Sequence, residues 1–271
     1  MNTKLVLLGT GTPVPEPDRS GPAVAVVVNQ DVYLFDAGAG IVRRASGAFE
    51  HGIPALDPTN LKRVFFTHLH SDHTVGYPDL ILTPWVVGRR TPLEAYGPEG
   101  LKSMTDHILL AYQQDYDIRV NGLEKLDPTG HTVNVHEIEP GTVYKDSSVT
   151  IEAFAVKHGS WPQAFGYRVQ GPDRTIVISG DTAPTQTVID ACDGCDILLH
   201  EVYVGSRPHR YMQAFHTSAD ELAKIANAAK PKLLVLYHQL YLDGKTDEDL
   251  LREIRRNYNG AVVSGRDLDD Y

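Results

Sequence analysis

The fold is decided by one stretch of the sequence, Phe65-Phe66-Thr67-His68-Leu69-His70-Ser71-Asp72-His73. Three histidines and an aspartate stand close together there, directly after an apolar run. Imidazole and carboxylate groups are the ligands that zinc and similar cations prefer. Because alternate residues of an extended segment point the same way, His68 and His70 can share one ion. Asp72 and His73 lie beyond them and can reach a second, so the stretch favours a two-metal site over a solvated polar loop.

Three more residues of ligand type follow apolar runs later in the chain: His158, Asp181 and His238. Each stands at the C-terminal end of a segment that reads as a β-strand, which is where α/β sheets place their chemistry. A single histidine after a strand is usually structural. Three strand-end residues of this type instead favour one common site.

Together these motifs resemble the metallo-β-lactamase superfamily, whose signature is His-x-His-x-Asp-His and whose remaining ligands follow later strands. The resemblance covers nearly the whole chain. It implies a four-layer αββα sandwich of the α/β class, with residues 1–271 as a single domain, whereas spacing alone supports only mixed sheets with helices. It also implies two Zn²⁺ ions, with Mn²⁺ or Fe²⁺ as alternatives. The ligands implied are His68, His70, Asp72, His73, His158, Asp181 and His238.

The resemblance also assigns roles inside this set. Asp181 would bridge the two ions, because a carboxylate has two oxygens. Ions roughly 3.5–4 Å apart can share a hydroxide that is available at neutral pH, and Asp72 would orient it. We therefore expect hydrolysis by a metal-bridging hydroxide, with Asp72 among the catalytic residues.

Further motifs resemble ribonuclease Z within the superfamily. One motif is Gly-Thr-Gly-Thr-Pro at 9–13, near the start of the chain. In addition, His200-Glu201 partly matches the His-Glu-Ala-Thr motif, and His216-Thr217-Ser218 partly matches the His-Ser-Thr motif. The match implies that His216 donates a proton or stabilises an oxyanion and that Glu201 holds it, a role typically worth 10²–10⁴-fold in rate. The alternative is that both residues only orient ligands. For the opening glycines we expect close packing of backbone beneath the site.

One part of ribonuclease Z is missing. That family carries an arm that grips tRNA, inserted between the third histidine ligand and the bridging aspartate. In this chain the segment between His158 and Asp181 is filled by two predicted strands, 166–169 and 175–179, and the turn that joins them. The formal net charge of −10 also opposes binding to a phosphate polymer. The chain therefore looks closer to the armless relatives often labelled arylsulfatase-like, and we expect nucleic acid to be an unlikely partner.

The expected function is a binuclear zinc hydrolase of a small ester, namely a phosphodiester, an aryl sulfate or a lactone. Arg89, Arg90 and Lys157 are candidates to bind an anionic centre, and each is equally compatible with a solvated surface. One alternative is a tRNA 3′-end endonuclease whose grip comes from residues 83–125 or from a dimer partner. The other is a metal-binding regulatory member without activity, which fits the full ligand set less well.

The composition and the cysteine content lead to expectations about cellular location and binding partners. Hydrophobic residues make up 42% and charged residues 22% of the chain, as in ordinary globular proteins. No apolar run is long enough to span a bilayer. Cys192 and Cys195 form a Cys-x-x-Cys pair, which suits a redox site or half a zinc knuckle, but the context favours two thiols without a special role. We expect a cytoplasmic homodimer without membrane contact.

Local patterns predict the regular elements. A capping box at Ser218–Glu221 opens a helix that Pro231 ends. The other helices are predicted at 78–87, 99–112 and 246–257, and strands at 4–8, 24–28, 32–35, in the region 131–156, and at 197–200.

Overall fold

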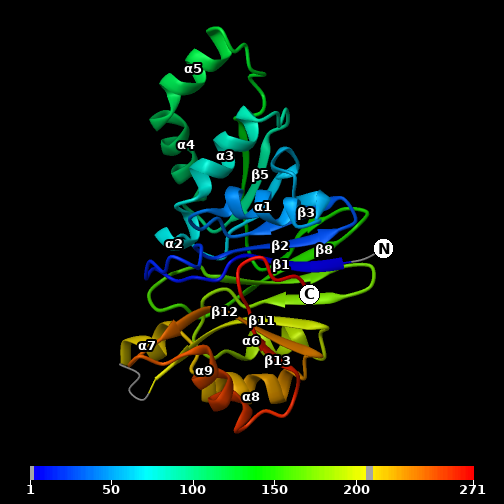
Figure 1. Ribbon diagram of the computed structural model, residues 1–271, viewed down its shortest axis with the longest axis vertical. Coiled ribbons are helices and arrows are strands. Elements are labelled where there is room, and N and C mark those ends of the chain that lie inside the picture. The colour runs from blue at the N-terminus through cyan, green and yellow to red at the C-terminus, as the bar shows by residue number, and fades with distance from the viewer. Residues whose placement is uncertain (1–2, 206–209) are drawn as a thin grey trace.

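The computed structural model describes residues 3–205 and 210–271, and its strands form two sheets that pack face to face (Figure 1). The first sheet has the order β1-β2-β3-β4-β5-β6. It is antiparallel from β1 to β3 and parallel from β3 to β6. Its strands are Thr3–Gly9, Ala23–Val28, Asp31–Phe35, Arg63–Phe65, Leu93–Gly97 and Val133–Glu137.

The second sheet has the order β13-β12-β11-β10-β9-β8-β7. Here β7 to β10 are antiparallel, and β10 to β13 are parallel. Parallel strands end at the same edge, so residues that follow them meet there. From β7 to β13 the strands are Gly141–Lys145, Thr150–Ala155, Phe165–Gln170, Thr175–Ile178, Ile197–Val204, Leu233–Tyr241 and Val262–Ser264.

Helices cover the outer face of each sheet and complete the four layers. The first sheet packs against α1, α3 and α4, and the second against α6, α8 and α9. The αββα sandwich expected from the resemblance is confirmed. The helices are α1 Ile41–Glu50, α2 Ser71–Thr74, α3 Tyr77–Val86, α4 Leu101–Ala111, α5 Gln113–Asn121, α6 Gln186–Cys192, α7 Arg210–Phe215, α8 Ala219–Ala229 and α9 Asp247–Arg255, with 3₁₀ turns at Pro54–Leu56 and Pro58–Asn60.

Strand β2 shows why the sequence folds into stacked layers. All six of its residues are buried, because one face meets the second sheet and the other meets the helices. Val24, Val26 and Val28 enter the core between the sheets, whereas Ala25 and Val27 face the outer core. A strand covered on both faces reads as a continuous apolar run, which is what the sequence shows.

Glycines allow backbone segments to touch beneath the metal-binding loop. A Cβ on Gly9 would lie 1.9 Å from the carbonyl oxygen of Gly21, and one on Gly76 would lie 2.2 Å from that of Gly38. A Cβ on Gly38 would likewise lie 2.3 Å from the carbonyl carbon of Gly21. The close packing expected for the opening glycines is confirmed.

Several predicted elements are confirmed. Two predictions are wrong, namely the end of the strand 197–200 and the free thiols. The capping box at Ser218 is present and starts α8. A short turn joins β9 to β10 as an antiparallel pair, with Thr175 opposite Gln170, so no arm is inserted there. The predicted strand 197–200 continues to Val204 as β11. Cys192 and Cys195 are not free thiols, because they form a disulfide at the end of α6.

Helices α4 and α5 extend away from the sandwich at one end of the molecule (Figure 1). They carry the exposed apolar side chains of Leu110 and Ile118, and Leu123 follows α5 and is exposed as well. Within the described ranges, each helix is too short or too polar to cross a membrane.

Candidate active site

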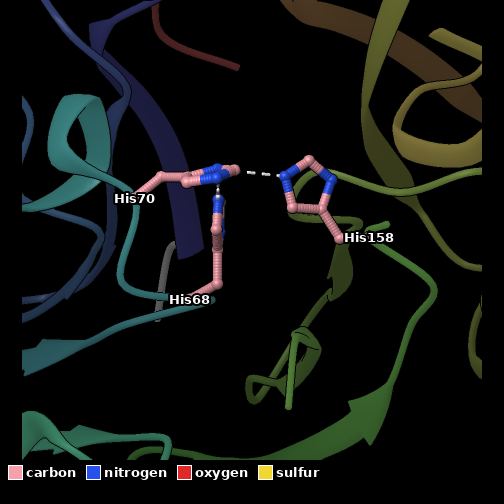
Figure 2. Close-up of side chains that lie close together, drawn as sticks. All are labelled: His68, His70 and His158. Atoms are coloured by element: carbon pink, nitrogen blue, oxygen red, sulfur yellow. Dashed lines mark hydrogen bonds between the residues drawn. The ribbon is translucent and has the colours of Figure 1, made fainter. Parts of the chain in front are cut away.

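Three histidine rings converge beyond the ends of β4 and β8. His68 and His70 follow β4 in an extended loop, and His158 follows β8 in the second sheet. The Nδ1 atom of His70 lies 2.9 Å from Nε2 of His68 and 3.1 Å from Nε2 of His158, as Figure 2 shows. Three nitrogens this close together form one side of a metal cage.

A second group of ligand atoms lies beside the first. The short helix α2 turns Asp72 and His73 inward, and β12 brings His238 to the same point. Oδ2 of Asp72 lies 3.3 Å from Nε2 of His238 and 3.5 Å from Nε2 of His73. These three residues have ligand atoms close enough to hold one ion.

Asp181 lies between the two groups, after β10 and the left-handed Gly180. One carboxylate oxygen, Oδ1, lies 3.4 Å from Nε2 of His73. The other, Oδ2, lies 3.4 Å from Nε2 of His238 and 4.0 Å from Nε2 of His158. The structure thus brings all seven sequence-predicted ligand residues together, with Asp181 between the two groups.

The donor set fits transition metal ions. Nε2 of His73 and Oδ1 of Asp181 are buried, and neither has a hydrogen-bond partner among the described residues. Buried polar atoms are normally paired, so these atoms are suited to coordinate an ion. Burial lowers the pKa of His158 to about 4 and holds that of His68 well below its ordinary value. Both rings are therefore neutral at pH 7, which is the form that binds metal.

Asp36 is a site residue that sequence reasoning missed. It follows β3 with a left-handed φ of 59°, and its carboxylate lies 2.8 Å from Nδ1 of His73. The same carboxylate accepts hydrogen bonds from the backbone N–H and hydroxyl of Thr67. A carboxylate behind a histidine ligand fixes its ring and tautomer. The signal available in the sequence was an aspartate at a strand end that neighbours the metal-binding loop.

His158 is oriented in a comparable way. Its Nδ1 lies 2.9 Å from the carbonyl oxygen of Phe215, which directs Nε2 toward the other histidines. Trp161 packs its ring edge-on against His70, with ring centroids 4.9 Å apart. The loop after β8 therefore covers one side of the cage.

His238 does not end its strand as expected. Strand β12 runs on to Tyr241, and a bulge lies at His238, because Tyr237 pairs with Glu201 and Gln239 pairs with Val202. The bulge gives His238 a left-handed φ of 45°. This extra residue turns the imidazole toward Asp72, and it interrupts the alternation from which a strand is recognised in sequence.

Glu201 and His216 form a buried pair next to the cage. Glu201 lies inside β11, and its Oε1 accepts hydrogen bonds from the backbone N–H groups of Thr182 and Thr217. Its Oε2 lies 3.4 Å from Nδ1 of His216. Burial opposes a charge on His216, but the carboxylate outweighs it and raises the pKa of His216 to about 9. The imidazole therefore carries a proton at neutral pH.

A groove of about 540 Å³ runs from the cage along the surface. Its lining includes Ser71 and Asp72 as well as Gly21 and Gly40. The exposed Val14 and Val75 are among its walls. A groove of this size and character accepts an organic group attached to a reacting centre at the metals.

The three candidate anion-binding cations behave differently. Arg89 is buried, and its guanidinium donates to backbone carbonyl oxygens, among them those of Leu61 and Ile81. It is a structural residue, so both alternatives given for it, anion binding and a solvated surface, are wrong. Arg90 and Lys157 are exposed, and Lys157 immediately precedes His158.

A four-layer αββα sandwich with a His/Asp cage where the two sheets meet defines a class of protein, the metal-dependent hydrolases of this fold. The sequence itself agrees. It matches the beta-lactamase superfamily domain over residues 32–239, and the chain belongs to that family. The protein is therefore a metal-dependent hydrolase of ester bonds.

Individual relatives narrow the comparison. The chain is 30% identical over 276 residues to "Ribonuclease Z" of Mycobacterium bovis (strain BCG / Pasteur 1173P2), which covers 98% of this chain and 96% of that protein. "Ribonuclease Z" of Mycobacterium marinum (strain ATCC BAA-535 / M) has the same identity and coverage. These relatives favour the endonuclease alternative over the expected small-ester hydrolase.

Solved structures support the fold. The metallo-beta-lactamase fold protein YhfI from Bacillus subtilis superposes with a TM-score of 0.77 at 19% identity, over 100% of both chains. Human tRNase Z, short form, gives a TM-score of 0.71 at 23% identity, over 99% of this chain and 98% of that one.

Proposed function

We propose that this protein is a two-metal phosphodiesterase that cuts RNA as an endonuclease of the ribonuclease Z kind. The observation that carries the proposal is the pairing of a seven-residue cage with the buried Glu201–His216 pair. Full-length similarity to proteins named ribonuclease Z supports RNA as the substrate class.

In this proposal His68, His70, His158 and Asp181 hold one ion. Asp72, His73, Asp181 and His238 hold the other. Two ions of this kind supply an activated water and neutralise the charge of a phosphodiester. Zinc suits the imidazole-rich set, and Mn²⁺ or Fe²⁺ are alternatives.

The protein residues supply the remaining steps. Asp72 accepts a hydrogen bond from the attacking water and orients it. His216, kept protonated by the charge of Glu201, donates its proton to the leaving oxygen of the ribose, so that the oxygen leaves as a hydroxyl. The groove beside Asp72 holds the nucleotide on one side of the scissile phosphate.

A second candidate is a hydrolase of small esters. It is favoured by the tight β9–β10 turn, which leaves no inserted arm, and by the net charge of −10. The projecting α4–α5 segment does not supply an obvious replacement grip, because its Lys102 and Arg119 pair with neighbouring aspartates.

The test is cleavage of a 3′-extended precursor tRNA by zinc-loaded protein at moderate salt, with a chromogenic aryl phosphodiester measured in parallel. We expect a single cut near the 3′ end, lost in the Asp72→Ala variant. If the same site hydrolysed the aryl ester but left the precursor tRNA intact, the protein would be a hydrolase of small esters instead. If the Asp72→Ala variant kept both activities, the proposed site would be wrong.

Two further expectations belong to this proposal. We place the enzyme in the cytoplasm, where precursor RNA is found. We also propose a homodimer, in which a second copy would extend the RNA-binding surface that a missing arm leaves small. Sedimentation of the purified protein tests the dimer.

A further inference from the structure

Arg19 lies in the loop that borders the groove, yet most of its side chain is buried, with 13% exposed. Its guanidinium lies 3.0 Å from the hydroxyl of Thr10 and 3.2 Å from a carboxylate oxygen of Asp247. It also donates to Oε1 of Gln239 in β12. Three separate segments therefore meet at one planar group.

Gln239 is the partner that connects this guanidinium to the cage. It is 1% exposed and is the next residue after His238. While its Oε1 accepts from Arg19, its Nε2 donates to the hydroxyl of Ser264 in β13 at 2.7 Å. The side-chain amide is thus held from both ends, and its place in the sheet is fixed.

His238 needs such support because its backbone is unusual. A non-glycine residue with φ of 45° adopts a conformation that persists only when its surroundings enforce it. Within β12, the residue after the bulge is the one that Arg19 holds. Lys in place of Arg19 offers a point charge without the planar fork that reaches several partners at once.

We propose that Arg19 is a positioning residue for the second metal ion: through Gln239 it holds the β12 bulge that presents His238 to Asp72. This inference rests on the proposed two-metal site. It predicts a selective effect, because the first ion's histidines follow β4 and β8 and, in the part of the chain that the structure describes, no hydrogen bond or ion pair joins them to Arg19 or Gln239.

The experiment measures stoichiometry and the two zinc dissociation constants by competition with a chromogenic chelator. In Arg19→Ala we expect the second constant to rise by about 10–100-fold, the range for removing a group that orients a ligand. The first constant should stay within about twofold of wild type. The second dissociation constant of Arg19→Lys should lie between those of the wild type and Arg19→Ala.

Two variants sharpen the test. Gln239→Leu should weaken binding of the second ion to the same extent as Arg19→Ala. The double variant should bind it no more weakly than either single variant, because both act through one contact. Arg44→Ala is the matched control. It removes an arginine that contacts Ser20 and Asp267 beside the same loop but does not contact β12. Both zinc dissociation constants should therefore be unchanged.

The outcomes separate the possible failures. If the wild type binds only one ion, the proposed two-metal site fails, and the role of Arg19 fails with it. If it binds two and both Arg19 variants keep the second constant, only the role of Arg19 is overturned. Equal weakening of both ions would also overturn it, because that is general destabilisation. Should Arg19→Ala not fold, Arg19→Lys and Gln239→Leu decide.

Discussion

At the scale of single residues, the site depends on carboxylates that do not belong to the cage. Asp36 fixes His73, and the negative charge of Glu201 keeps His216 protonated. Both are buried where an unpaired charge would be costly, so each needs the hydrogen bonds it receives from neighbouring backbone. The ligands themselves were predictable, because imidazole and carboxylate at strand ends form a local pattern. Asp36 offered only its place at a strand end as a signal and Arg19 offered none, because their partners lie in distant segments of the chain.

Removing the proposed proton donor should separate substrates by leaving group. His216→Ala should keep both metal ions and lose roughly 10²–10⁴-fold in kcat on an RNA phosphodiester. With p-nitrophenolate as leaving group the loss should be much smaller, because that oxygen needs little protonation. Steady-state kinetics with both substrates and elemental analysis check this. Equal losses on the two substrates would exclude proton donation, and loss of metal would make His216 a ligand or orienting group.

His200 should make the fold sensitive to acid. It is fully buried in β11, and burial lowers its pKa to about 4, below the ordinary value near 6.5. As pH falls from 6.5 to 4, the unfolded chain therefore takes up a proton that the folded chain refuses, and stability decreases. The loss from this one group is on the order of 3 kcal/mol.

The His200→Asn variant tests that assignment. Its unfolding free energy, measured with urea in the presence of a chelator, should fall less steeply with acid than that of the wild type. His158 keeps its own contribution in both proteins. An unchanged slope would show that His200 does not carry the effect.

At the scale of elements, strands and helices were predicted more accurately than the points where they end. Helix 78–87 appears as α3 and 99–112 as α4, because their periodic apolar faces pack on the first sheet. Strands β11 and β12 both continue past their predicted ends. Glu201 was placed at the end of its strand because it is polar, although it lies inside β11 as a buried partner of the site.

The glycine contacts predict opposite effects at two positions. Gly9→Ala should lower the free energy of unfolding by about 1–3 kcal/mol, because the new methyl group would collide with the backbone of Gly21. Gly47→Ala in α1 is the control. Its Cβ would meet nothing closer than 3.5 Å, and alanine favours a helix, so stability should rise by about 0.5–1 kcal/mol. Chemical denaturation of both variants measures this, and an unaffected Gly9→Ala would contradict the close packing.

At the scale of the whole molecule, fold and family agree with the expectation from sequence, whereas the expected preference for small esters is now the second candidate. The pairing of Cys192 with Cys195 was missed because spacing allows a disulfide without requiring it. That residues 1–271 form a single domain stays a prediction.

The missing arm makes a prediction about salt. Binding of the His216→Ala variant to precursor tRNA should weaken by no more than about two log units per log unit of salt, since each contacted phosphate contributes about 0.9. Few phosphates can be contacted by an acidic chain without an arm. Filter binding between low and moderate salt measures the slope. A slope several-fold steeper would point to a basic surface formed by a partner copy.

The seven cage residues are spread from His68 to His238, and both sheets contribute to them. During synthesis, the residues around the first ion are all present once Asp181 has been made. In the proposed two-metal site, the second ion would have to wait for His238, whose strand β12 lies between β11 and β13 in the second sheet. We therefore expect metal loading to be ordered in time, with full loading only in a chain whose synthesis has passed β12. A ribosome-bound chain stalled before β12 would hold one ion and have no phosphodiesterase activity.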